Sequence, residues 1–596
     1  MNPVIKTEGL TREFGGRRAV DGLDIEVRPG EIFGLLGPNG AGKTTTIRIL
    51  TTLLSPTSGR ATVCGLDVSR DAAEVRRRIG YVSQEKGVRH LLTARESAEI
   101  EADLHHIPRR ERERRVSEVL DVVGLLPEAG RQVAEFSGGM LKRLDLACGL
   151  LQQPEVLILD EPTLGLDVQA RHRIWEHVAR LRGHGVSVLL TTNYLDEADR
   201  LCDRVAIIDE GRKVVSGAPD ELKYGVGAEV LHVVTDDVAG IRSLVDGQDW
   251  VHRLLEPEPR TVHLHVDDAM AALAFVAGAG HEHGVVVDQI GYQRPTLDDV
   301  FLLHTGHRVN AADEERPPAP ARPPSPAASA HLGARGRLSG YRQETVALLR
   351  RWYLQLRRER LNLVFTLLQP AIWLVFFGSS LRGAVDPGAV AGADYIAFML
   401  PGVIAFTAVG LGVSGAVPLL WDKETGYLGR LMSMPLARGS IVVSRILFQM
   451  ALGAVQTVII LLVALALGAR PAAHVGDTLL VLVAVMLLTA ALTAAFIALA
   501  YTSSSHTTFF AISGFASFPL LFASNAFVEL DAMPQWLAAV ARLNPLTYAI
   551  EVVRGLVLNG WRAGLSWPLL VLALFALVCL VTAGRQVPAR AGRGLR

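Results

Sequence analysis

The sequence has few of the features that mark secreted or nucleic-acid-binding proteins. Its 596 residues include four scattered cysteines without a CxxC pair. This excludes a disulfide framework and suits a reducing cytosol, where we expect the cysteines to be small buried residues. Basic and acidic residues balance at 60 each, so bulk charge favours neither nucleic acid nor an acidic partner. The N-terminus carries no apolar run, so we expect no cleavable signal.

Charge is also scarce in the last third of the chain. Charged residues concentrate before Arg360, and apolar residues dominate after Leu361. A chain of this length is too long for one hydrophobic core. We therefore expect an α/β P-loop domain at 1–225, a small α+β domain at 226–306, a proline-rich linker at 307–338 and an all-α membrane domain at 339–596.

The first region alternates short apolar runs with helical patterns, as α/β domains do. The runs 31–36, 156–160 and 186–191 predict buried strands, and Thr44 to Leu54 has the pattern of a helix. Between the first strand and this helix lies a glycine loop, whose backbone N–H groups attract phosphate. The loop consists of Gly37, Pro38, Asn39, Gly40, Ala41, Gly42, Lys43 and Thr44, followed by Thr45.

The glycine loop carries its own chemical groups for a nucleotide. Lys43 can reach the β- and γ-phosphates of ATP, and the Thr44 hydroxyl can bind Mg²⁺. Asp160 ends a predicted strand, where a carboxylate can hold Mg²⁺ through water. Glu161 follows and can polarise an attacking water. These residues predict ATP hydrolysis.

A second anion-binding helix start occurs at Ser137-Gly138-Gly139, in a helix that we expect to continue through Leu150. One ATP does not need two phosphate cradles so far apart in sequence. One explanation is that this cradle serves the ATP bound to another subunit, which predicts a partnership between two copies of the chain.

The small domain shows no catalytic constellation. Residues 261–266 alternate as in a half-buried strand, residues 268–277 predict a short helix, and Thr296 to Asp299 resembles a helix cap. His263 and His265 share one strand face, with His281 and His283 expected on a nearby turn. Both a metal site and structural histidines fit this pattern, and the structural interpretation is favoured.

The linker favours an extended tether over a recognition motif. An amphipathic stretch at 341–360 follows, whose arginines suit the cytoplasmic membrane surface: Arg350, Arg351, Arg357, Arg358 and Arg360. Six apolar segments are then each long enough to cross a bilayer: 362–380, 395–419, 441–468, 477–501, 509–527 and 565–583.

Basic residues set the expected orientation of these spans. They cluster at 350–360, 423–445 and 585–596, which lie on one side if there are six spans, and this side must be the cytosol. The opposite segment from Val528 to Gly564 is partly apolar and can fold into short re-entrant helices.

The segment Ser137-Gly138-Gly139-Met140 is diagnostic of ATP-binding cassette (ABC) proteins. Nearly the whole chain resembles an ABC exporter of the daunorubicin/doxorubicin-resistance type, with the ATPase fused ahead of a type-2 permease. Residues 295–301 resemble the end of the ATPase extension in those exporters. Asn544-Pro545-Leu546-Thr547 is a familiar feature of their permeases.

The resemblance assigns further roles in the ATP site. Gln84 matches the Q-loop, Asp167 the D-loop, and Phe14 the aromatic residue that stacks on adenine. A histidine normally follows Thr191-Thr192, yet Asn193 stands there. An amide can contact the γ-phosphate but carries no charge. The catalytic candidates are Glu161, Asn193 and Gln84; those for Mg²⁺ are Thr44, Gln84 and Asp160; Phe14, the glycine loop through Thr45, Ser137, Gly138, Gly139 and Asp167 would bind ATP.

We therefore expect a homodimeric half-transporter in the cytoplasmic (inner) membrane, with ATP and Mg²⁺ as cofactors and no nucleic-acid partner. The segment 421–435 is expected to transmit closure to the spans. The expected cargo is an exported amphipathic drug or secondary metabolite, with a lipid or lipid-linked glycan as the alternative. Phe515, Phe518 and Phe522 form a stripe that faces cargo, lipid or a second copy. A non-transporting, compound-sensing ATPase remains a second class.

Overall fold

The computed structural model describes residues 2–84, 91–183, 185–225, 229–305, 334–381, 395–469, 474–503, 505–526, 528 and 530–591. These residues form two compact units. The first takes in the described parts of Met1–Lys86, Ser117–Pro127 and Phe136–His331. The second takes in the described parts of Gly87–Val116, Glu128–Glu135 and Leu332–Arg596. The predicted linker lies outside the described residues up to 333, and a helix begins at Ala334 rather than after 338.

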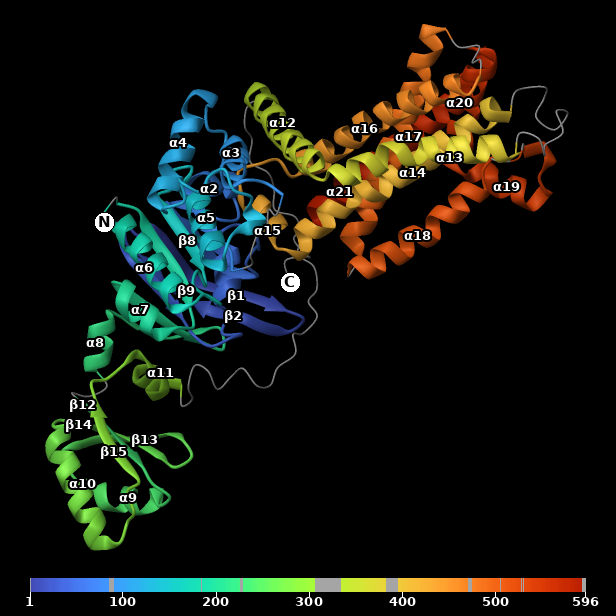
Figure 1. The fold of residues 1–596 in the computed structure, drawn as a ribbon. Coiled ribbons are helices and arrows are strands. Elements are labelled where there is room, and N and C mark those ends of the chain that lie inside the picture. The colour runs from blue at the N-terminus through green and yellow to red at the C-terminus, as the bar shows by residue number, and fades with distance from the viewer. Residues whose placement is uncertain are drawn as a thin grey trace. The chain divides into compact units, whose positions relative to one another are not determined.

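A six-stranded sheet organises the first unit, in the order β11-β10-β4-β9-β8-β7 (Figure 1). Its strands are β4 (Ile32–Leu36), β7 (Ile79–Val82), β8 (Val156–Asp160), β9 (Ser187–Thr192), β10 (Arg204–Asp209) and β11 (Arg212–Gly217). All pairings are parallel except that of β11. The three predicted strands are confirmed. They are neighbours in the sheet, so their carboxyl ends meet at one edge, where α/β sheets bind ligands.

Helices flank this sheet within the first unit: α1 (Lys43–Leu50), α2 (Ala72–Arg78), α5 (Gly138–Leu150), α6 (Val168–Arg182), α7 (Leu195–Leu201) and α8 (Pro219–Tyr224). Helix α5 ends at Leu150, as predicted. Helix α1 ends four residues before the predicted Leu54, and Thr52 adopts a left-handed φ of 61° in the turn that follows. This conformation cannot continue a right-handed helix.

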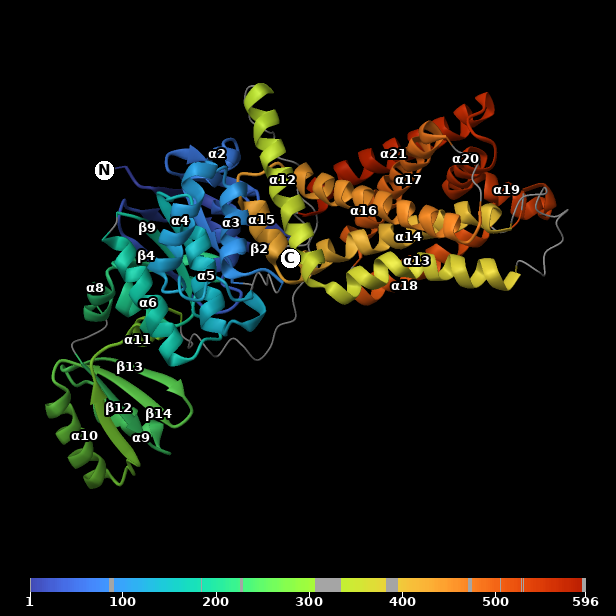
Figure 2. The ribbon, with the colours of Figure 1, turned by 45° about the horizontal axis from the view of Figure 1, so that its top comes forward.

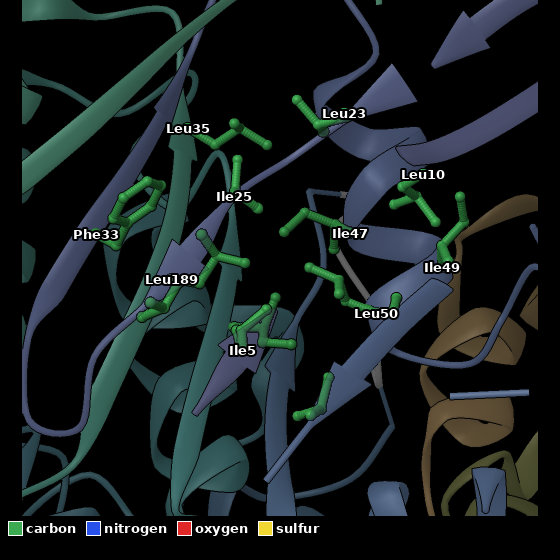
Figure 3. Packing of buried hydrophobic residues seen from close by; sticks show 14 of the residues in the cluster. Ile5, Leu10, Leu23, Ile25, Phe33, Leu35, Ile47, Ile49, Leu50 and Leu189 are labelled. Atoms are coloured by element: carbon green, nitrogen blue, oxygen red, sulfur yellow. The ribbon is translucent and has the colours of Figure 1, made fainter. Parts of the chain in front are cut away.

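The core of the first unit joins the parallel sheet to a second, antiparallel one. The second sheet consists of β1 (Ile5–Phe14), β2 (Arg17–Leu23), β3 (Glu26–Val27), β5 (Ser58–Val63) and β6 (Leu66–Asp67). Figure 3 shows Ile5 and Leu10 of β1 packed with Ile47 and Leu50 of α1. Helix α1 is therefore held on its apolar face, which fixes the position of the glycine loop at its start.

The small domain is a four-stranded antiparallel sheet in the order β13-β14-β12-β15, with helices α9 and α10 on one face (Figure 2). Its elements are β12 (Glu229–Val234), α9 (Val238–Val245), β13 (Val251–Glu258), β14 (Thr261–Val266), α10 (Ala269–His283), β15 (Gln289–Gln293) and α11 (Leu297–Thr305). This order of elements is the ferredoxin-like arrangement. The predicted cap of α11 is confirmed, since Thr296 and Asp299 bond each other's backbone N–H.

The four histidines singled out in this domain lie on two elements. His263 and His265 are buried in β14, and His263 lies 3.3 Å from Asp299. His281 and His283 belong to the last turn of α10, so the prediction of a turn was wrong. The alanine-rich sequence continues the helix to Gly284, whose left-handed φ of 72° ends it. No group of three or more metal-binding side chains occurs among the described residues.

The second unit is helical. Its helices are α3 (Ala94–Leu104), α12 (Ala334–Arg358), α13 (Arg360–Leu381), α14 (Tyr395–Glu424), α15 (Tyr427–Ser433), α16 (Arg438–Ala466), α17 (Val475–Thr502), α18 (His506–Phe522), α19 (Gln535–Leu543), α20 (Pro545–Asn559) and α21 (Ser566–Ala591). Helix α4 (Arg109–Val122) contains residues of both units: those up to Val116 belong to the second unit and those from Ser117 to the first. Helix α17 packs against α14, α16, α20 and α21. The predicted short helices after Val528 are confirmed as α19 and α20.

Four helices among the described residues are long and apolar enough to cross a bilayer: Ile396–Glu424, Arg438–Ala466, Val475–Thr502 and Ala563–Gly584. The other two predicted spans contain shorter apolar helices, Leu363–Phe376 and His506–Phe522. The prediction of six spans is therefore not confirmed for α13 and α18, and α18 is the shorter helix. Its 17 residues extend about 26 Å, less than a bilayer core of about 30 Å.

The side chain of Asn544, which precedes α20, caps the C-terminal end of the short helix α18. The Asn544 amide donates hydrogen bonds to the carbonyl oxygens of Leu520 and Ala523, at 2.6 and 2.7 Å. Its carbonyl oxygen accepts from the backbone N–H of Leu546 and caps α20. One amide thus satisfies two helix ends. Such pairing matters for any helix that ends at membrane depth, because unpaired backbone groups are costly there.

Three arginines of α12 bind carboxylates, a role that the membrane-surface interpretation did not include. Arg350 pairs with Glu99 at 2.6 Å, and Arg358 pairs with Glu96 at 2.8 Å, both carboxylates lying on α3. Arg351 forms two hydrogen bonds with Asp422 near the end of α14. Sequence alone shows the amphipathic pattern but not its partner, because an acidic helix and a membrane both attract a basic face.

A buried ion pair joins α3 to α15 within the same unit. Arg430 donates from Nε and Nη2 to one carboxylate oxygen of Glu101, at 3.2 and 2.9 Å. The side chains are only 4% and 1% exposed. Arg430 lies in the predicted transmitting segment 421–435, whereas no sequence pattern marked Glu101. Because both charges are removed from water, each depends on the other.

We predict that Arg430→Ala destabilises the second unit by about 3–5 kcal/mol, since it leaves Glu101 buried without its cation. Arg350→Ala is the matched control. It breaks the partly exposed pair between Arg350 of α12 and Glu99 of α3. We expect this variant to lose about 1 kcal/mol or less of stability. Thermal unfolding in detergent measures both. Equal shifts in the two variants would contradict the role given to burial, and exchanging the charges of Glu101 and Arg430 should restore part of the loss.

Candidate functional site

The glycine loop leaves β4 and enters α1 through conformations that favour glycine. Gly37, Gly40 and Gly42 have φ angles of 156°, 83° and 102°. A Cβ atom on Gly37 would lie 2.2 Å from the carbonyl oxygen of Ile208, and one on Gly42 would lie 2.4 Å from that of Ala19. The close packing leaves no room for side chains, so backbone N–H groups can line the cradle, as a bound phosphate requires.

Three predicted site residues meet at the cradle. Lys43 is buried, and its ammonium group donates to the carbonyl oxygens of Gly37 and Pro38 at 2.7 and 3.1 Å. The same group lies 3.5 Å from a carboxylate oxygen of Glu161. The amide of Gln84 donates to the other carboxylate oxygen of Glu161 at 2.8 Å. The structure therefore brings together residues that are far apart in sequence.

Glu161 is held in an unusual backbone conformation. Its φ of 46° is left-handed, which non-glycine residues rarely adopt, and its N–H donates to Thr191 of the neighbouring strand. Burial raises the pKa of its carboxyl, while Lys43 opposes that shift. A strained, buried carboxyl at a strand end is typical of a functional site.

Asp160 has the geometry of a cation ligand. One carboxylate oxygen accepts hydrogen bonds from Thr191 at 2.7 Å and Thr44 at 3.3 Å. The other is buried and has no hydrogen-bond partner among the described residues. A buried carboxylate oxygen beside a threonine hydroxyl fits Mg²⁺, which takes its remaining ligands from phosphate and water. The residues present thus fit the ion.

The second predicted cradle also forms. Ser137 caps α5 by accepting a hydrogen bond from the N–H of Met140 at 3.3 Å, and its side chain is exposed. A Cβ on Gly139 would lie 2.8 Å from that of Ala170, so α5 and α6 approach closely there. Asp167 caps α6 by accepting from the N–H of Ala170 at 2.8 Å. The predicted signature and D-loop residues therefore start two neighbouring helices.

Two further predicted residues, Phe14 and Asn193, lie at the ends of other strands. Phe14 ends β1, with the Arg12 guanidinium 4.6 Å from the centre of its ring. Asn193 follows β9, and its side-chain oxygen is buried without a hydrogen-bond partner among the described residues. The structure places Asn193 at the same sheet edge as Glu161 and the glycine loop, while a stacking role for Phe14 stays a prediction.

Sequence reasoning missed Lys142 of α5. Its buried ammonium group donates to the carbonyl oxygens of Ser83 and Gln84, at 3.1 and 3.0 Å. It thereby ties the helix that starts at Ser137 to the loop carrying Gln84. A lysine in a helix has no distinguishing sequence signal, because its target is a pair of backbone oxygens.

Comparison with known proteins agrees with this site. Residues 20–164 match the family described as ABC transporter, and residues 343–558 match the family described as ABC-2 type transporter. Three relatives are 36% to 45% identical to this chain over about half of its length. The chain belongs to the ABC transporters. It is an ATPase and an ABC-2 permease in one polypeptide, and it resembles drug-resistance exporters.

The relatives match half of this chain and nearly all of their own. Daunorubicin resistance ATP-binding protein DrrA2 of Streptomyces coeruleorubidus is 45% identical over 51% of this chain and 96% of its own length. Daunorubicin/doxorubicin resistance ATP-binding protein DrrA of Streptomyces peucetius is 39% identical over 52% and 97%. The Nod factor export ATP-binding protein I of Ralstonia nicotianae is 36% identical over 52% and 95%.

We predict that Asn193→Ala lowers kcat more than it raises KM for ATP. The hydrogen bond to the γ-phosphate should strengthen as charge develops in the transition state. Its loss should cost about 1.5–3 kcal/mol, or roughly ten- to hundredfold in rate. Asn193→His should turn over at least as fast as wild type. Steady-state ATPase activity across pH in one lipid tests all three proteins, and wild-type kcat in Asn193→Ala would make Asn193 a turn residue only.

Proposed function

We propose that this ABC transporter is a homodimeric half-transporter that exports an amphipathic drug or secondary metabolite across the cytoplasmic membrane. The observation that carries the proposal is the pairing of one complete phosphate cradle with a second, exposed cradle at Ser137. One chain has one glycine loop and one permease, so a symmetric dimer would supply two of each.

In the dimer, ATP would lie between the glycine loop of one subunit and residues Ser137 to Gly139 of the other. The exposure of Ser137 supports this arrangement, because a partner can reach it. Asp167 starts the helix beside the signature glycines and would meet the same partner. Lys43 would hold the phosphates, Thr44 and Asp160 would hold Mg²⁺ with Gln84 nearby, and Glu161 would polarise water.

Helix α3 supports a route from ATP to the membrane. A short stretch of chain leads from Gln84, which contacts Glu161, to α3. Helix α3 is in turn held by Arg430 of α15 and by Arg350 and Arg358 of α12. We infer that ATP binding at Gln84 displaces α3, which follows it in sequence, and that α15 passes this displacement to α14 and α16, which flank it in sequence.

We further propose six spans, with the ATPase and both ends in the cytosol. Helix α13 has 22 residues and would extend about 33 Å. Helix α18 would be a short span, ended by Asn544. Its aromatic stripe is exposed, with Phe515, Phe518 and Phe522 at 81%, 65% and 61%. An aromatic face of this kind suits a flat amphipathic cargo.

A lipid or lipid-linked glycan is the second candidate cargo. The 36% identity to a protein named for Nod factor export supports keeping it. The relatives named for daunorubicin resistance are more similar, at 45% and 39% identity, and they favour a drug-like cargo.

The decisive experiment measures flux and ATPase activity in the same vesicles. Purified protein in liposomes, with its ATPase facing the added ATP, should accumulate daunorubicin inside. The control is Glu161→Gln, which should bind ATP yet turn over very slowly, because the phosphate cradle stays intact while the water-polarising carboxylate is gone. Stimulated ATPase without flux would indicate a sensor, and flux of a fluorescent lipid alone would indicate the second cargo.

Mixed dimers test the shared ATP site. A Lys43→Ala chain paired with a Ser137→Ala chain has one undamaged site and one doubly damaged site. We therefore expect a photoreactive ATP analogue to label mixed dimers at one site, on the Ser137→Ala chain's glycine loop. Dimers of either variant alone should label weakly. Stoichiometric labelling of isolated wild-type monomers, with no dimer formed, would contradict the shared site.

A further inference from the structure

A carboxyl group outside the ATP cradle lies between the loops that complete the ATP site. Glu197 of α7 is fully buried, with 0% exposure. One of its oxygens accepts a hydrogen bond from the indole N–H of Trp175 in α6, at 2.9 Å. Helix α6 is the helix that Asp167 caps, so Glu197 bears on the element that presents the D-loop.

The side chains of Thr192 and Thr163 lie near the carboxyl of Glu197, and each lowers its pKa as a hydrogen-bonding neighbour. Thr192 ends β9, directly before Asn193. Thr163 follows Glu161 by two positions and begins the stretch that leads to Asp167. Neither the second oxygen of Glu197 nor the hydroxyl of Thr163 meets hydrogen-bond geometry with any described residue, and both are buried. Two adjacent buried groups of this kind are suited to bond each other.

Burial favours the neutral form of Glu197, and the hydrogen-bonding neighbours oppose that preference only in part. The groups that face its carboxyl from β9, α6 and the Glu161–Asp167 loop are the neutral side chains of Thr192, Trp175 and Thr163. The titratable groups that act on it are Asp196 and the buried thiol of Cys202, and neither favours a carboxylate. Arg200 and His172 contact the ring of Trp175. Burial accordingly raises the pKa of Glu197.

We propose that Glu197 is a neutral carboxylic acid whose hydrogen bonds to Trp175, Thr163 and Thr192 fix the D-loop and the switch residue Asn193 relative to each other. The protonated oxygen donates to a threonine hydroxyl, and the carbonyl oxygen accepts from the indole. Glu197 is fully buried and would act through the segments that carry Asp167 and Asn193, so it is a positioning residue for ATP hydrolysis. It would join the segment that meets the partner subunit to the segment that meets the γ-phosphate.

Three substitutions in the full-length protein in lipid test this assignment. Glu197→Gln keeps the size, the neutrality, one donor and one acceptor, so kcat should stay within about twofold of wild type. Glu197→Ala should lower kcat about tenfold or more with KM for ATP nearly unchanged, because the phosphate cradle is not touched. The control is Asp196→Asn, which changes the neighbouring exposed acid on the same helix and should have no effect.

The pH profile distinguishes positioning from packing. As pH rises through the raised pKa of Glu197, the acid loses the proton that it donates, so wild-type activity should fall relative to Glu197→Gln. A packing role would leave this ratio constant. If Glu197→Ala does not fold, Thr163→Val tests the same bond, because it keeps the shape and removes the hydroxyl. We expect a lower kcat in Thr163→Val and no further loss when Glu197→Gln is added.

Two results would overturn the proposal. If Glu197→Gln is as slow as Glu197→Ala, a carboxylate is required, and Glu197 does not link the two segments as a neutral acid. If Glu197→Ala, or Thr163→Val in its place, keeps wild-type kcat across pH, Glu197 does not position the site. Neither result bears on the dimer or the cargo, because the readout is the rate of ATP hydrolysis alone.

Discussion

The buried pairing of Glu101 with Arg430 is the interaction on which the proposed coupling of ATP hydrolysis to the permease depends. Two opposite charges at 4% exposure or less have no water to replace a missing partner. Because separating these two buried charges would cost a large free energy, helices α3 and α15 are constrained to move together. The two other pairs, Glu96–Arg358 and Glu99–Arg350, are more exposed to solvent. They help to orient α3 but contribute less free energy to holding it.

The ATP site follows a second constraint, the order of strands in the parallel sheet. Strands β4, β9 and β8 are adjacent, so the glycine loop, Asn193 and Glu161 emerge at one edge. Every further link leaves from this edge. Gln84 bonds Glu161 and precedes the chain that leads to α3, Lys142 ties the backbone at Gln84 to the helix that starts at Ser137, and Glu197 bonds Trp175 in the helix that Asp167 caps.

The parts that sequence predicted well are those encoded locally. The glycine loop, the strand ending at Asp160 and the helix from Gly138 to Leu150 each have a short-range pattern that sterics and capping enforce. Long-range pairing was not predictable. The arginines of α12 suggested a membrane surface, and only the fold shows Glu96 and Glu99 opposite them. Similarly, α18 is short because Asn544, more than twenty positions from Leu520, ends it.

We propose that ATP hydrolysis drives cargo transport by displacing α3. The most direct test is the number of cargo molecules transported per ATP hydrolysed. Glu101→Gln keeps the shape of the side chain and removes the charge that holds Arg430, and Glu99→Gln is its partly exposed control. The account predicts that transport per ATP falls in Glu101→Gln, stays near wild type in Glu99→Gln, and recovers when the charges of Glu101 and Arg430 are exchanged. An unchanged ratio in folded Glu101→Gln protein would contradict it.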